Sequence, residues 1–156
     1  MKSAEQWFNE YGESHQNPTN ELIHWICIPL ILFSTLGATW AISASSFVEF
    51  GLPYYINAGT IITFLGFIWY LTVSPKLSIG MVLEIGAMLF LINALYLNGI
   101  PLLQLSGIIF VGAWIGQFIG HKIEGKKPSF FKDLQFLLIG PFWLMSKIYD
   151  KLKIGY

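Results

Sequence analysis

The chain has 156 residues, enough for one domain; 54% are hydrophobic and only 12% are charged, and the mean hydropathy is +0.59. Soluble domains carry about 25% charged residues, so too few are present here to cover a water-facing surface, and we expect an integral membrane protein. The formal net charge is zero and the nine basic residues are all lysine, a composition that excludes the arginine-bearing basic patch of a nucleic-acid-binding protein.

The N-terminal segment is polar and predicts a short amphipathic helix over Ser3–Tyr11. Asn17-Pro18 interrupts it. Asparagine is a favoured residue before the first turn of a helix, and proline is favoured at the first helical position. A new helix is therefore expected to begin near Pro18.

Four apolar runs are each close to the roughly 20 residues that a helix needs to cross a bilayer. The predicted spans are His24–Ser43, Tyr54–Val73, Leu77–Leu97 and Pro101–Gly120. Short turns follow the second and third runs, so these spans must be antiparallel neighbours. A shorter apolar segment, at about 130–149, is interrupted by Gly140-Pro141 and predicts an interfacial or re-entrant helix. The expected fold class is thus an all-α integral membrane protein, one membrane domain over 1–156, with four antiparallel transmembrane helices and a C-terminal interfacial or re-entrant helix.

The lysines support this topology. In a four-span arrangement all of them fall on one side: Lys2, Lys76, Lys122, Lys126, Lys127, Lys132, Lys147, Lys151 and Lys153. The positive-inside rule makes that side cytoplasmic and places both termini there, in a bacterial inner membrane, or in the endoplasmic reticulum membrane of a eukaryote. Several aromatic residues are expected to form belts at the membrane interfaces, namely Tyr54, Tyr55, Trp69, Tyr70 and Trp143.

The three histidines are expected to meet at this cytoplasmic face. His15 precedes the first span, His24 begins it and His121 ends the fourth. Three imidazoles can bind one divalent metal and leave coordination positions open. Zinc would suit a hydrolase and ferrous iron would suit oxygen chemistry. The alternative is that the histidines are ordinary surface or capping residues of that face.

Polar neighbours of the histidines share their helical stripes. Asn17, Asn20 and His24 are spaced for one face of a helix, as are Gln117, His121 and Glu124. Asn20, Gln117 and Glu124 can orient imidazole N–H groups from outside the metal ligands. Asn20 and Glu124 are therefore candidate catalytic-site residues.

Glu84 stands out because it lies about two helical turns inside the third apolar run. A carboxyl at that depth is costly unless it is paired or solvated, and it marks a candidate functional site. We expect it to line the cavity beneath the metal. The alternative is a protonated carboxyl that bonds to another helix.

Two segments together resemble a known family. Tyr11–Pro29 reads YGESHQNPTNELIHWICIP and Gln117–Pro128 reads QFIGHKIEGKKP. They are similar to the small membrane-protein family that includes the fungal 2-hydroxy-fatty-acid dioxygenase of phytosphingosine breakdown. The resemblance implies an iron(II)-dependent dioxygenase that uses O2 to shorten 2-hydroxy fatty acids by one carbon, with His15, His24 and His121 as metal ligands. Lys147 departs from the acidic residue expected there in relatives.

Three rival functions remain open at this stage. A haem-binding membrane protein would use two of the histidines as axial ligands, and a zinc lipid hydrolase would need no oxygen. A non-catalytic membrane subunit would have histidines that merely face lipid headgroups. Membrane lipid is an expected partner in every case, and a homo-oligomer is compatible with the sequence.

Overall fold

The protein was analysed as a computed structural model, which describes residues 2–125 and 130–156, with side chains described for all of these except 130–136. The described residues form six α-helices: α1 (Ala4–Gly12), α2 (Pro18–Glu49), α3 (Ala58–Val73), α4 (Pro75–Leu97), α5 (Leu102–Glu124) and α6 (Phe130–Lys151). All regular elements in this part of the chain are helical, which confirms the predicted all-α class.

Local capping chemistry sets the first two helices where the sequence predicts them. Ser3 caps α1 in a capping box with Gln6. Asn17 caps α2 by accepting hydrogen bonds from the backbone N–H groups of Thr19 and Asn20, and Pro18 begins the helix. Helix α2 runs on to Glu49 and is therefore longer than its predicted apolar span.

Helix α3 is shorter than the predicted span Tyr54–Val73. It begins at Ala58, because the Asn57 side chain caps its first turn, and it has 16 residues. At 1.5 Å per residue this is about 24 Å, less than the roughly 30 Å hydrocarbon core. Among the described residues three helices, α2, α4 and α5, are long and apolar enough to cross a membrane.

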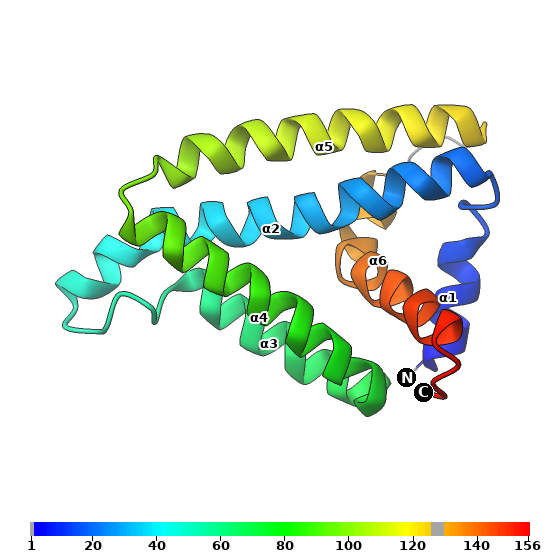
Figure 1. The fold of residues 1–156 in the computed structure, drawn as a ribbon, viewed down its shortest axis with the longest axis horizontal. Helices are drawn as coiled ribbons and strands as arrows, with labels where there is room; N and C mark the ends of the chain where they lie inside the picture. Colours follow the sequence, from blue (N-terminus) through cyan, green and yellow to red (C-terminus); the bar gives the residue numbers. More distant parts are fainter. Residues whose placement is uncertain (1, 126–129) are drawn as a thin grey trace.

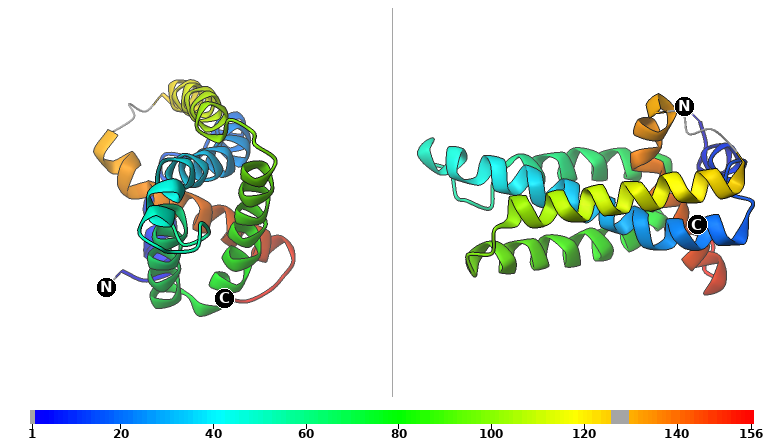
Figure 2. Two further views of the ribbon diagram at one scale, coloured as in Figure 1. Left: turned by 90° about the vertical axis from the view of Figure 1, so that its left-hand side faces the viewer. Right: turned by 90° about the horizontal axis from the view of Figure 1, so that it is seen from above.

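Helices α2 and α5 run side by side, as do α3 and α4, and the two pairs diverge toward the end that holds the chain termini (Figures 1 and 2). The chain reverses direction from each of these helices to the next. Helix α2 packs most extensively on α5. The start of α2, the end of α5, helix α1 and both termini gather at one end of this bundle (Figure 1). This is the end that the sequence predicts for the histidines.

Helix α6 lies across that end and contacts α1, α2 and α4. It contributes Ile139, Phe142, Leu144 and Met145 to the hydrophobic core. Trp143 is only 5% exposed and Tyr70 only 2%, so their expected places in an aromatic belt are wrong; both side chains pack inside the protein instead. Lys126 and Lys127, the side chain of Lys132 and the motif residue Pro128 lie outside the described residues.

Candidate metal centre

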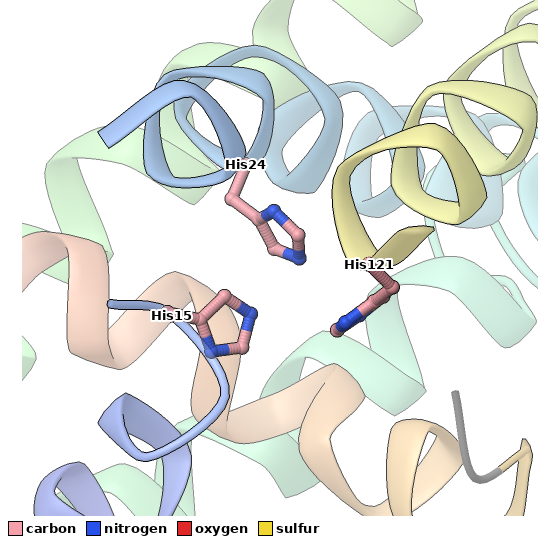
Figure 3. A group of neighbouring side chains, drawn as sticks. All are labelled: His15, His24 and His121. Atoms are coloured by element: carbon pink, nitrogen blue, oxygen red, sulfur yellow. The ribbon is translucent and has the colours of Figure 1, made fainter. Parts of the chain in front are cut away.

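The three histidines converge as predicted. His15 lies in the turn between α1 and α2, His24 in the second turn of α2, and His121 in the last turn of α5. All three are buried, at 5%, 0% and 8% exposed. One ring nitrogen from each lies within 4.8 Å of the others, and the rings face a common space (Figure 3). This separation suits three ligands of one metal ion.

Backbone carbonyls fix the orientation of two of the rings. Nδ1 of His15 lies 2.7 Å from the Tyr11 carbonyl oxygen, and Nδ1 of His24 lies 2.9 Å from the Asn20 carbonyl oxygen. A carbonyl oxygen only accepts, so each Nδ1 carries the proton and each Nε2 presents a lone pair. Within the described residues neither Nε2 has a hydrogen-bond partner, although both are buried. Unsatisfied, inward-facing acceptors on neutral imidazoles are the donor set that a metal ion would complete.

The surroundings keep His15 neutral. Burial away from water, together with the nearby His121, lowers the pKa of His15 to about 4 against the opposing effect of the Tyr11 carbonyl. The ring is therefore uncharged at neutral pH, which is the form that binds a metal.

Two aromatic residues that the sequence did not single out for the site enclose His15. The Tyr11 ring stacks on the His15 ring with centroids 4.2 Å apart, and the Trp143 ring lies 5.4 Å from it. Tyr11 is one helical turn before His15, and this spacing can be recognised in the sequence. Trp143 comes from α6, which no local pattern connects to His15.

Glu124 and Asn20 join the segments that carry the histidines. One Glu124 carboxylate oxygen accepts a hydrogen bond from the Gln16 backbone N–H at 2.9 Å. The other accepts from the Asn17 backbone N–H at 2.9 Å and from the Asn20 side-chain amide at 3.0 Å. The Asn20 amide also donates to the Ser14 carbonyl at 3.1 Å. The end of α5, the His15 turn and the start of α2 are thereby tied together, so these two residues position the site rather than occupy its centre.

Glu84 is not brought to the histidines. It lines a different cavity of about 470 Å³, hereafter the Glu84 cavity, together with Trp25 and Pro29 of α2, Leu83 of α4 and Leu144 of α6. In the structure Glu84 thus faces a cavity that residues of α2 and α6 also line. The expected role beneath the metal stays a prediction.

Two further cavities lie near the histidines, and His15 lines the first of them. One, the charged cleft, has a volume of about 1200 Å³, and its lining includes His15, Gln16, Glu21, Lys76, Lys147 and Asp150. Lys147 donates to Glu21 at 2.7 Å inside it. The other, the apolar cavity, has a volume of about 40 Å³ and lies between α2, α5 and α6, with a lining that includes Tyr11, Ile28, Ile31, Leu32, Trp114 and Gln117.

Comparison with known proteins adds to this geometry. Residues 1–152 match the model of a family described as 2-hydroxy-palmitic acid dioxygenase Mpo1-like. The chain is 29% identical over 147 residues to the 2-hydroxy-palmitic acid dioxygenase MPO1 of Saccharomyces cerevisiae, an alignment that covers 91% of this chain and 77% of the yeast protein. No solved structure matches the chain. The family match extends over both segments that carry the three histidines, and the chain therefore belongs to the 2-hydroxy-palmitic acid dioxygenase Mpo1-like family.

Proposed function

We propose that this protein is an iron(II)-dependent dioxygenase that removes one carbon from 2-hydroxy fatty acids with O2 as co-substrate. The family and the name of the yeast relative support the reaction class. The observation that carries the metal assignment is the pair of buried Nε2 atoms of His15 and His24, which lack hydrogen-bond partners in the described part of the chain and face His121.

In this proposal His15, His24 and His121 hold the iron. When bound, iron(II) would supply the electrons for oxygen chemistry and a binding point for the hydroxyl and carboxylate oxygens of the substrate. The Tyr11 and Asn20 carbonyls hold two of the imidazoles in the tautomer that donates through Nε2. Tyr11 and Trp143 exclude water from one side of His15. The protein thus positions the reactants and keeps part of the site free of water, while the reactivity belongs to the reactants themselves.

We also propose that the site lies at the cytoplasmic face of a four-span protein, with α3 as a short fourth span. The described lysines, Lys2, Lys76, Lys122, Lys147, Lys151 and Lys153, belong to the elements and termini that meet at the histidine end of the bundle (Figure 1). A head group at this level with its alkyl chain in the bilayer is the arrangement that a 2-hydroxy fatty acid favours.

The test is metal content and oxygen use of protein purified without oxygen. We expect one iron per chain, and oxygen consumption that depends on added 2-hydroxypalmitate. His15→Ala, His24→Ala and His121→Ala should each remain in the membrane and lose most of the iron, because removal of one of three ligands leaves an incomplete site. Gln104→Ala, at an exposed position near the opposite end of α5, is the matched control and should retain it.

Three outcomes would contradict the proposal. Full iron in His121→Ala would remove that residue from the ligand set. A haem absorption band that disappears in the same variant would favour the haem protein. Zinc with oxygen-independent lipid hydrolysis would favour the hydrolase.

A further inference from the structure

Two cavities of opposite character lie near the histidine cluster. His15 itself lines the charged cleft, which opens among α1, α6 and the start of α4. Apart from Tyr11, Trp114 and Gln117, the described residues that line the apolar cavity carry no polar side chain. A ligand that spans both would need a charged head and an apolar tail.

The apolar cavity comes close to the histidines. Tyr11 lines it and stacks on His15 with centroids 4.2 Å apart. Gln117 lines it one helical turn before His121. Tyr11 and Gln117 therefore form the mouth of this cavity, the end nearest the histidines.

From that mouth the cavity runs toward the middle of the bundle. Along α2, Ile28, Ile31 and Leu32 follow His24 by 4, 7 and 8 residues, which at 1.5 Å per residue is about 6 to 12 Å. On the antiparallel α5, Trp114 precedes His121 by 7 residues, or about 10 Å in the same direction. Both helices thus place the cavity on the bilayer side of the histidines.

We propose that this cavity receives the alkyl chain of the substrate. The inference rests on the proposed function and adds the path of the alkyl chain. The head of the substrate lies at the histidines, with its carboxylate toward the charged cleft. The first carbons of the tail pass between Tyr11 and Gln117. The volume of about 40 Å³ holds about three groups of water size. The remaining chain passes Leu32, which is partly exposed on the outer surface of the bundle, and continues among the lipid chains.

The Glu84 cavity is the rival path. It is larger, at about 470 Å³, and mostly apolar, but within the described part of the chain none of its lining side chains stacks on a histidine, whereas Tyr11 of the apolar cavity stacks on His15. An alkyl chain in the Glu84 cavity would also lie beside the Glu84 carboxyl. Continuity with the histidines therefore favours the apolar cavity.

Substitutions that fill one cavity at a time test this path through chain-length selectivity. Leu32→Trp narrows the apolar cavity and Leu83→Trp narrows the Glu84 cavity, while Leu30→Trp places the same side chain on an exposed face of α2. With a series of 2-hydroxy acids of increasing length, Leu32→Trp should lower kcat/KM for the long acids relative to the shortest by at least about tenfold. Leu30→Trp and Leu83→Trp should keep the wild-type ratio. Leu32→Ala, which enlarges the cavity and does not risk overpacking, should shift the ratio toward long acids.

A binding measurement that needs no turnover completes the test. The anaerobic iron-loaded protein is irradiated with a 2-hydroxy acid that carries a diazirine a few carbons from its head. Label on the peptides that contain Ile31 or Trp114 supports the proposal, and label on the peptide that contains Glu84 overturns it. A length shift in Leu83→Trp but not in Leu32→Trp would also overturn it. If iron-loaded protein consumes no oxygen with any 2-hydroxy acid, the proposed reaction fails, while the labelled position still decides the binding path.

Discussion

At the residue scale, Glu124 does the most to hold the candidate site together. Its two carboxylate oxygens accept from three N–H donors, of Gln16, Asn17 and Asn20, over a sequence separation of more than one hundred residues. Charge-assisted hydrogen bonds of this kind are about twice as strong as neutral ones. Glu124 contacts no imidazole in these bonds, so we expect it to act on the metal through the position of the His15 turn.

Glu124→Gln should therefore weaken iron binding while the protein stays folded. The amide keeps one acceptor oxygen but turns an NH2 group toward backbone donors, so the His15 turn loses at least one bond. We expect an increase in the Kd for iron of about 10- to 100-fold, as found when groups that orient metal ligands are removed. Anaerobic titration of the metal-free protein measures it.

The control for this substitution is Glu49→Gln, at an exposed position at the far end of α2. It should leave the iron Kd unchanged. The unfolding temperature of the metal-free Glu124→Gln protein should stay near the wild-type value. A merely structural role of Glu124 would instead lower the unfolding temperature and the iron affinity together. Wild-type iron affinity in Glu124→Gln would remove Glu124 from the positioning network.

At the element scale, the close approach of α2 and α5 brings His24 and His121 together. A Cβ atom added to Gly116 would lie 2.5 Å from the Cys27 sulfur, and one added to Gly120 would lie 2.3 Å from the Asn20 side-chain oxygen. Small residues spaced four apart let two membrane helices pack closely. At both positions the neighbouring helix thus lies too close for any side chain larger than a hydrogen atom.

Gly116→Ala is expected to destabilise the protein by about 1–3 kcal/mol, because an overpacked contact forces the two helices apart. Gly112→Ala is the matched control on α5, since a Cβ there meets nothing within 4 Å. Cys27→Ala removes the atom that the new methyl group would strike, so the double variant should show a favourable coupling of about 1 kcal/mol. Unfolding in detergent measures all four proteins. Strict additivity would show that Cys27 is not the obstacle.

At the scale of the whole molecule, the histidines and both termini share one end of the bundle, and the turn between α4 and α5 lies at the other (Figure 1). The sixteen residues of α3 are few for a span, yet α3 runs beside α4 along the bundle. If α3 crosses a locally thinned bilayer, both termini lie on the cytoplasmic side.

Reporter fusions test this topology. A reporter at Tyr156 should report the cytoplasm, because an even number of crossings returns the C terminus to the side of the N terminus. A reporter inserted at Asn98 should report the opposite side, because α5 crosses the membrane between Asn98 and the C-terminal segment. A second Asn98 reporter of the complementary type serves as control. Reporters on the same side at both positions would contradict a span in α5. A Tyr156 reporter on the side opposite to a reporter at the N terminus would mean an odd number of crossings and would leave α3 outside the count.

Features that depend on neighbouring residues could be predicted from the sequence. Hydropathy separated the apolar helices from the polar ends, and Asn17 and Pro18 predicted the start of α2, because these effects act within one or two helical turns. The predicted start of α3 was wrong, because Asn57 caps the helix and the several apolar residues before it remain outside the helix. The histidines were identified, together with Asn20 and Glu124, from helical spacing and from the family motifs.

How these residues meet depends on the packing of the helices in three dimensions. Hydropathy indicates that a helix lies in lipid but leaves its rotation open, so the sequence could not predict that Glu84 lines a cavity together with residues of α2 and α6. For the same reason Trp143, which was expected in a membrane belt, lies beside His15. The three imidazoles lie within reach of one ion because glycines on α5 allow α2 to approach and Glu124 holds the His15 turn. Those contacts join residues about one hundred positions apart, and their geometry is set by side-chain packing that no local pattern encodes.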